Sequence, residues 1–191
     1  MVEPGNLMRA HFVAAVAAQF LYVGAQVGTW SYFIQYAQQY TSVPEREAGY
    51  YLTGTLAAFA VGRFFSAWLM RLVRPHLLMG FYALANTGLA LVAVLHPGWA
   101  GLWCLLLTSF FMSLMFPTIF ALGIKELGDK TKIGGSVLVM SIIGGAVLTP
   151  AMGKMSEMGH GVALAYVVPL LSYCGVAVYA FFGSQPRGSA G

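Results

Sequence analysis

The stretch that decides the fold is PHLLMGFYALANTGLALVAVLHPGWAGLWCLLLTSFFMSLMFPTIFALGI, residues 75–124, which contains no Lys, Arg, Asp or Glu. A bilayer core about 30 Å thick is crossed by about 20 apolar residues in a helix. This stretch is too long for one crossing, and His96-Pro97-Gly98 in its middle is a turn signal. We therefore interpret it as a helical hairpin within a membrane.

The composition of the whole chain agrees with a membrane protein. Of its 191 residues, 59% are hydrophobic and 8% are charged, whereas soluble domains have roughly 45–50% apolar and about 25% charged residues. The composition therefore argues against a soluble fold and against nucleic-acid binding. Cys104 and Cys174 lie inside apolar runs without His or carboxylate neighbours at ligand spacing. We expect both to be packing residues, and we predict no cofactor and no metal site.

The remaining charge-poor stretches extend the prediction to six transmembrane helices. Their predicted ranges are 12–38, 48–71, 76–95, 99–124, 133–153 and 162–183. The first apolar run is too long for the hydrophobic region of a cleavable signal peptide, so we expect it to remain as a span. The fold class is then an all-α membrane protein, with residues 1–191 forming a single six-helix bundle.

The basic residues of the connections predict the orientation. One side of the membrane receives seven of them and the other receives two: Arg9, Arg71, Arg74, Lys125, Lys130, Lys132 and Arg187 against Arg46 and Lys154. Cytoplasmic loops carry an excess of Lys and Arg, so the seven-residue side and both termini are expected in the cytoplasm, beneath a bacterial inner membrane. The charged segment 125–132 is interpreted as a solvated loop; a gate that pairs with another domain is the alternative.

The first predicted helix carries a polar and aromatic stripe. Gln19, Tyr22, Gln26 and Trp30 fall at i, i+3, i+7 and i+11, which places them on one face. Amides, a hydroxyl and an indole suit a sugar, whose hydroxyls need hydrogen-bonding partners and whose C–H faces stack on aromatic rings. We predict that this stripe binds substrate; hydrogen bonding between packed helices is the alternative. Residues 36–40 near the outer end are expected mostly at the membrane interface.

Three further features lie at membrane depth. Arg63, the only charged residue within a predicted span, is expected to reach the headgroups or a cytoplasmic salt bridge, with substrate binding as the alternative. Pro117 frees one backbone carbonyl and bends its helix, which in transporters often marks a binding site or hinge; a kink without function is the alternative. A small-residue stripe predicts close approach of another helix: Ser141, Gly145, Thr149 and Gly153.

The acidic residues all lie in the termini or connections: Glu3, Glu45, Glu47, Glu126, Asp129 and Glu157. No predicted helix carries a carboxylate at membrane depth, so this sequence lacks a proton relay of the usual kind. It also lacks a nucleophile elbow, an HExxH motif and a phosphate-binding glycine loop. We therefore expect the protein not to be an enzyme.

Three strings resemble the C-terminal six helices of the L-fucose:proton symporter family of the major facilitator superfamily. They are AQFLYVGAQVGTWSYFIQYA (18–37), YYLTGTLAAFAVGRFFSAWLM (50–70) and FMSLMFPTIFALGIKELGDKTKIGGSVLVMSIIGGAVLTPAMG (111–153). The resemblance implies a twelve-helix transporter of two six-helix bundles, with alternating access and a sugar held between them. It also implies a proton as coupling ion. In that family the carboxylates credited with proton coupling belong to the N-terminal half, which is missing here, and this would explain the absence of an acidic residue at membrane depth.

One departure from the family concerns the sugar. Fucose-transporting members have a sugar-binding tyrosine immediately before PTIF, where this sequence has Phe116. The resemblance therefore predicts the C-terminal half of a secondary active transporter for fucose, glucose or galactose, with Phe116 joining the stripe in the site. Expected partners are the sugar, the lipid bilayer and an N-terminal six-helix half in the same or a separate polypeptide. The alternatives are a half that pairs with itself and a membrane protein that binds a partner helix without transporting.

Overall fold

The computed structural model describes residues 4–125, 127–158 and 161–184, with side chains from residue 10 onward. Within these ranges six helices are long and apolar enough to cross a membrane, and no strand occurs, which confirms the predicted fold class. These candidate spans are Ala10–Thr41, Glu45–Leu69, Pro75–Leu95, Trp99–Ile124, Gly128–Glu157 and Val162–Gly183.

Three of the six spans are interrupted. The elements in chain order are α1 (Pro4–Thr41), α2 (Glu45–Leu69), α3 (Pro75–Leu95), α4 (Trp99–Met112), α5 (Met115–Ile124), η1 (Gly128–Lys130), α6 (Thr131–Met140), α7 (Ile143–Glu157), α8 (Val162–Ala165), α9 (Val167–Val178) and η2 (Tyr179–Gly183). The fourth span is thus α4 with α5, the fifth contains α6 and α7, and the sixth is α8, α9 and η2. α1 continues past its predicted end and stops where Ser42 adopts a positive φ of 58°.

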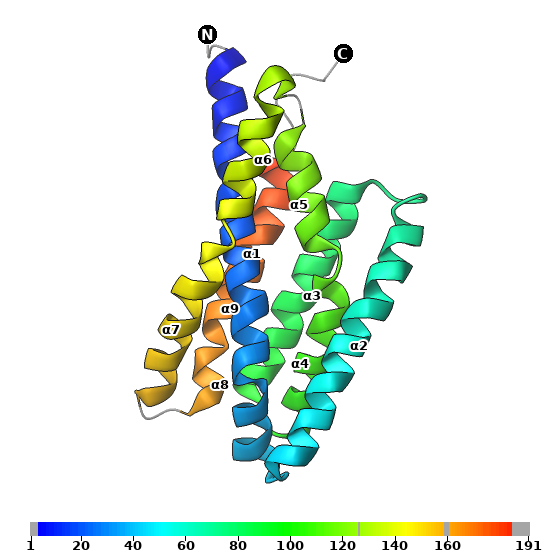
Figure 1. Ribbon diagram of the computed structural model, residues 1–191. Coiled ribbons are helices and arrows are strands. Elements are labelled where there is room, and N and C mark those ends of the chain that lie inside the picture. Colours follow the sequence, from blue (N-terminus) through cyan, green and yellow to red (C-terminus); the bar gives the residue numbers. More distant parts are fainter. Residues whose placement is uncertain (1–3, 126, 159–160, 185–191) are drawn as a thin grey trace.

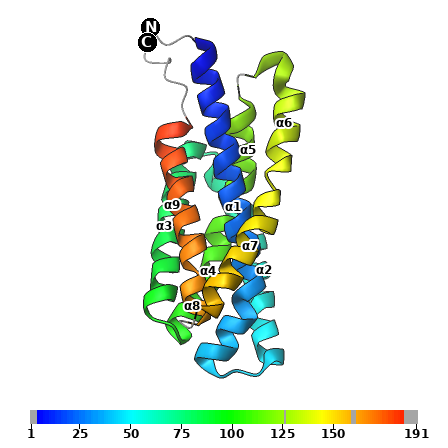
Figure 2. The ribbon, with the colours of Figure 1, turned by 90° about the vertical axis from the view of Figure 1, so that its left-hand side faces the viewer.

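Helix α1 runs through the middle of the bundle. In Figure 1 it lies between α2 and α7, with α3 and α9 behind it, and it packs on α7, α9 and α5. Figure 2 shows the start of α1 and the end of η2 at the same end of the bundle. In the view of Figure 1 no other helix passes in front of the lower part of α1.

The contact between α1 and α7 is close because glycines line it. A Cβ placed on Gly144 would lie 2.8 Å from the carbonyl carbon of Phe20, and one on Gly145 would lie 3.0 Å from Val27 Cγ2. The predicted close approach at the small-residue stripe is therefore present. Its tightest point is Gly144, one residue outside that stripe, because there the neighbour is backbone.

Residues 36–40 tie α1 to its neighbours, which differs from a purely interfacial role. Tyr36 is buried and its hydroxyl donates to the Ala93 carbonyl at 2.7 Å. Gln39 Oε1 accepts a hydrogen bond from the backbone N–H of Val162 (3.1 Å), and the Tyr40 hydroxyl accepts one from the N–H of Ala163 (3.2 Å). The first N–H groups of a helix have no partner within it, so α1 caps the start of α8.

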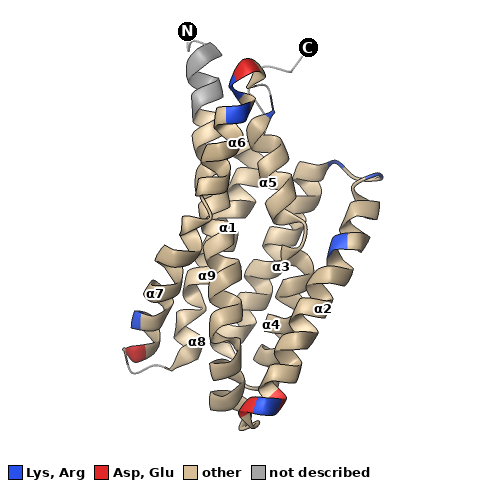
Figure 3. Cartoon of the chain, viewed as in Figure 1, with Lys and Arg blue, Asp and Glu red and all other residues tan. Residues whose placement is uncertain are grey.

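The charged residues gather at the two ends of the bundle, with one exception within α2 (Figure 3). The connections that carry Arg71, Arg74 and the segment 125–132 lie at the end where α1 begins, whereas Arg46 and Lys154 lie at the opposite end. Gly128 to Lys132 are exposed. Glu3, Glu126, Arg187 and the side chain of Arg9 lie outside the described residues.

Candidate functional site

The fourth span breaks at Ser113 and Leu114, between α4 and α5. Pro117 lies in the first turn of α5, and because proline has no backbone N–H, the carbonyl four residues earlier loses its helical partner. That carbonyl belongs to Ser113. The predicted bend is therefore present, as a break whose centre precedes the proline.

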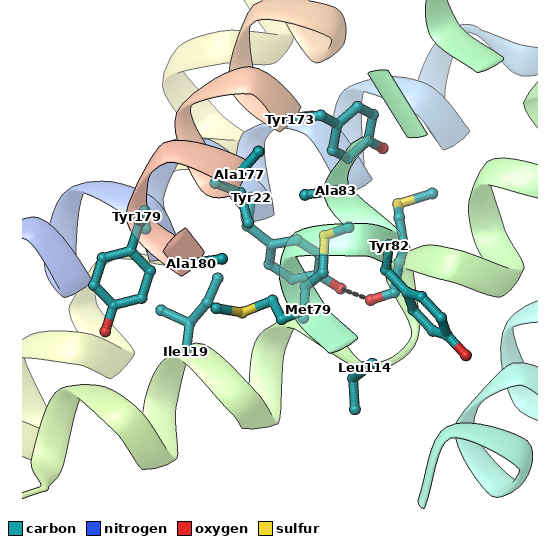
Figure 4. Close-up of a cluster of buried hydrophobic side chains, with 14 of the residues drawn as sticks. Tyr22, Met79, Tyr82, Ala83, Leu114, Ile119, Tyr173, Ala177, Tyr179 and Ala180 are labelled. Carbon is teal, nitrogen blue, oxygen red and sulfur yellow. Dashed lines mark hydrogen bonds between the residues drawn. The ribbon is translucent and has the colours of Figure 1, made fainter. Parts of the chain in front are cut away.

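Tyr22 reaches this break from α1. Its side chain is fully buried, and its hydroxyl donates to the Met112 carbonyl at 3.0 Å (Figure 4). Met112 ends α4, and the last carbonyls of a helix lack partners within it. The ring of Tyr22 meets Phe116 edge on, with centroids 6.3 Å apart. Tyr22, predicted as a substrate ligand, thus supports the backbone beside Phe116 in this conformation.

Trp30 lies farther along α1, beside α4 and α2. Its indole N–H donates to Ser109 Oγ at 3.1 Å, and its ring packs edge on against Phe59, with centroids 5.3 Å apart. The sequence-based prediction missed Ser109 and Phe59. Two signals were available, since the pair Thr108-Ser109 interrupts an apolar run and Phe59 precedes Arg63 by one helical turn.

The predicted stripe on α1 is divided by its neighbours. Gln19 is fully buried, and neither of its amide atoms has a hydrogen-bond partner among the described residues. Gln26 and Trp30 are half-buried. Because α5 and α9 pack on α1, the beginning of the stripe points into the bundle, and only Gln26 and Trp30 border the surface.

The open face of α1 beyond Trp30 is polar. Ser31, Gln35 and Gln38 are exposed there on one side of the helix. Gln26 is half-buried and lies about half a turn away from Gln35 around the helix axis. Polar side chains within spans almost always face a bundle interior or an aqueous cavity. This polar strip, Ser31 with Gln35 and Gln38, is therefore unsuited to contact with lipid tails.

Arg63 contacts the broken helix. Its side chain is exposed, and its Nη1 donates to the carbonyl oxygen of Ser113 at 3.2 Å. The reason is local, since Pro117 leaves that carbonyl without a helical donor. The sequence-based prediction did not include this hydrogen bond, because the sequence does not show which backbone atom lies across the helix interface.

Comparison with known proteins identifies relatives of one kind. No family model matches the sequence. It is 44% identical over 178 residues to the L-fucose-proton symporter of Escherichia coli K12, which covers 92% of this chain and 40% of that protein. It is 32% identical over 177 residues to the putative glucose/galactose transporter of Helicobacter pylori 26695, covering 91% of this chain and 44% of that protein.

The fold agrees with these sequence relationships. A crystal structure of the major facilitator superfamily transporter FucP in the outward conformation matches with a TM-score of 0.89 at 44% identity, over 92% of this chain and 42% of that one. The chain spans only about two fifths of the length of these relatives, which are transporters rather than enzymes. With its six membrane-capable helices, it is an integral, multi-pass membrane protein that corresponds to one half of a fucose permease-like transporter of the major facilitator superfamily.

Proposed function

We propose that this chain is the C-terminal half of a proton-coupled transporter that takes up a hexose or deoxyhexose by alternating access. The observation that carries the proposal is the polar strip of α1, left open next to Trp30 and a broken helix. The names of the relatives, a fucose-proton symporter and glucose/galactose transporters, support sugar as the substrate class. Fucose, glucose and galactose all remain candidates.

The partner in this proposal is an N-terminal six-helix half. Only 17% of the most apolar 18-residue stretch of α2 and 28% of that of the fifth span are buried, compared with 44–56% for the other four spans. The helices α2 and α7 of these two poorly buried spans lie on either side of α1 in Figure 1. A face with a polar centre and apolar sides suits a second bundle, because the apolar sides pack while the polar centre lines a cavity.

The chemistry of the face suits a sugar. Gln26 offers an amide that both donates and accepts hydrogen bonds, and Trp30 and Phe116 offer aromatic surface for the C–H face of a pyranose. Tyr22 and Gln19 are buried behind them, and Tyr22 holds the site from within in this conformation through its hydrogen bond to the Met112 carbonyl. Phe116 has no hydroxyl, which leaves hydrogen bonding at its position to other groups.

Proton coupling is assigned to the other half. The acidic residues among the described ranges are Glu45, Glu47, Asp129 and Glu157, all at the ends of helices. No carboxylate of this part of the chain lies at membrane depth, where proton relays are built. The basic connections at the end where α1 begins support a cytoplasmic location for both termini in a bacterial inner membrane.

Uptake measurements in cells lacking sugar transporters test the proposal. The chain is expressed alone and together with the N-terminal half of a related symporter, and radiolabelled fucose, glucose and galactose are supplied. We expect pH-gradient-driven uptake of one of these sugars only with both halves. Uptake by this chain alone would favour a self-pairing half, and its absence in both cases, with both proteins in the membrane, would favour a non-transporting role.

A matched pair of variants tests the site. Gln26→Ala removes a half-buried amide one helical turn before Trp30, whereas Gln38→Ala removes an exposed amide about 18 Å farther along α1. We expect Gln26→Ala to raise the half-saturating sugar concentration roughly 2- to 12-fold, the effect of one hydrogen bond. Equal effects of the two substitutions would count against the assigned site.

A further inference from the structure

The break between α4 and α5 exposes a set of backbone carbonyls, and almost every one has an identifiable donor. Phe110 O accepts from Ser113 Oγ at 2.7 Å, and Leu114 O accepts from Thr118 Oγ1 at 2.8 Å. Met112 O accepts from Tyr22. Ser113 O, the carbonyl that Pro117 deprives of its helical partner, accepts from Arg63.

The approach of α2 to this break depends on the residue before Arg63. A Cβ on Gly62 would lie 2.8 Å from Ser113 Oγ and 3.1 Å from the carbonyl carbon of Phe110. The absence of a side chain at Gly62 therefore lets the α2 backbone lie directly against the break. This close contact brings the guanidinium group within 3.2 Å of the Ser113 carbonyl.

We propose that Arg63 is a positioning residue, whose guanidinium supplies the hydrogen-bond donor that Pro117 cannot give to the Ser113 carbonyl. The bond holds α5 at an angle to α4 and thereby sets the place of Phe116, the second residue of α5, against Tyr22. Arg63 and Tyr22 bracket the break from α2 and α1, each bonded to one freed carbonyl. A charged donor is suited to this role because its hydrogen bond is stronger than that of a neutral group.

A double-mutant cycle tests the proposal without reference to transport. Pro117→Ala restores a backbone N–H within reach of Ser113 O, so Arg63 becomes dispensable in that background. Arg63→Met keeps an unbranched apolar stem but removes the hydrogen-bond donors and the charge of the side chain. We expect Arg63→Met to lower the melting temperature in detergent by roughly 3–10 °C in the native background, and by less than a third of that value beside Pro117→Ala.

Two controls separate this role from a general effect of the charge. Pro150→Ala restores an N–H in α7, away from Arg63. In the Pro150→Ala background we expect Arg63→Met to lower the melting temperature by the same amount as in the native background. Arg63→Lys keeps a charged donor and is expected to recover part of the melting temperature. Equal losses from Arg63→Met in the native and Pro117→Ala backgrounds, or equal suppression by Pro150→Ala, would overturn the proposal.

The expected effect of Arg63 on sugar binding rests on the proposed function. In the complex with an N-terminal half, Arg63→Met is expected to raise the half-saturating sugar concentration, and Pro117→Ala is expected to suppress that change to within twofold. If the unsubstituted complex takes up no sugar, the proposed function fails while the coupling in melting temperature still decides the role of Arg63. If uptake is present but the change persists beside Pro117→Ala, the positioning role fails.

Discussion

Substitution of Gly144 by alanine tests whether the contact between α1 and α7 depends on direct backbone approach. The added methyl carbon would lie 2.8 Å from the carbonyl carbon of Phe20, whereas ordinary contacts begin near 3.4 Å. The two helices must therefore separate by more than 0.6 Å at this point, because the carbonyl oxygen of Phe20 lies closer still. The obstacle is backbone within a helix, which cannot rotate away as a side chain can.

The cost of this separation follows from packing. A gap of roughly 0.5–1 Å already forfeits a quarter to a half of the attraction between the atoms it separates, and overpacking costs typically 1–3 kcal/mol. For a chain of this size that predicts a fall in melting temperature of roughly 2–12 °C. Helix propensity acts in the opposite direction, since alanine is favoured over glycine by about 1 kcal/mol within a helix.

Thermal unfolding in detergent, followed by the fluorescence of the tryptophans, measures the effect. Gly88→Ala is the matched control, because a Cβ on Gly88 of α3 would meet no atom within 4 Å. We expect this control to unfold at or above the temperature of the native chain. An unchanged melting temperature for Gly144→Ala, or a change equal to that of Gly88→Ala, would refute the argument from backbone contact.

Two further predictions concern the ends of the bundle. His11→Phe removes a side chain whose Nδ1 lies 2.6 Å from Gly183 O and whose Nε2 lies 2.9 Å from Leu122 O. We expect the free energy of unfolding to fall by roughly 1–3 kcal/mol and amide hydrogen exchange at the end of α5 to become faster. Unchanged exchange rates there would contradict this prediction. Gly161→Ala forces a side chain into a φ of 74° and to within 2.7 Å of Gln39 Nε2, with an expected loss of about 1–2 kcal/mol. Gly49→Ala, which meets no atom within 4 Å, is its control in thermal unfolding.

The α1 stripe shows what helical periodicity can predict and what it cannot. Helical spacing places Gln19, Tyr22, Gln26 and Trp30 on one side of α1, yet the structure buries Gln19 and Tyr22 and leaves Gln26 and Trp30 at the surface. Periodicity describes the helix itself and is the same along its length. The neighbours of α1 differ along its length, so residues on one face meet different surroundings.

The sequence by itself determined the membrane fold, because spans are recognised from properties that each segment carries alone. Charge-free length, the position of charged residues and the missing N–H of Pro117 do not depend on what lies across the bundle. Only the tertiary structure decided which atoms meet. That Arg63 supplies a donor to Ser113 O, that Tyr22 bonds Met112 O, and that Gly144 meets backbone all depend on the distance and rotation of neighbouring helices. Hydrogen bonds and close packing change within a few tenths of an ångström, a precision that the pattern of residues along one helix does not contain.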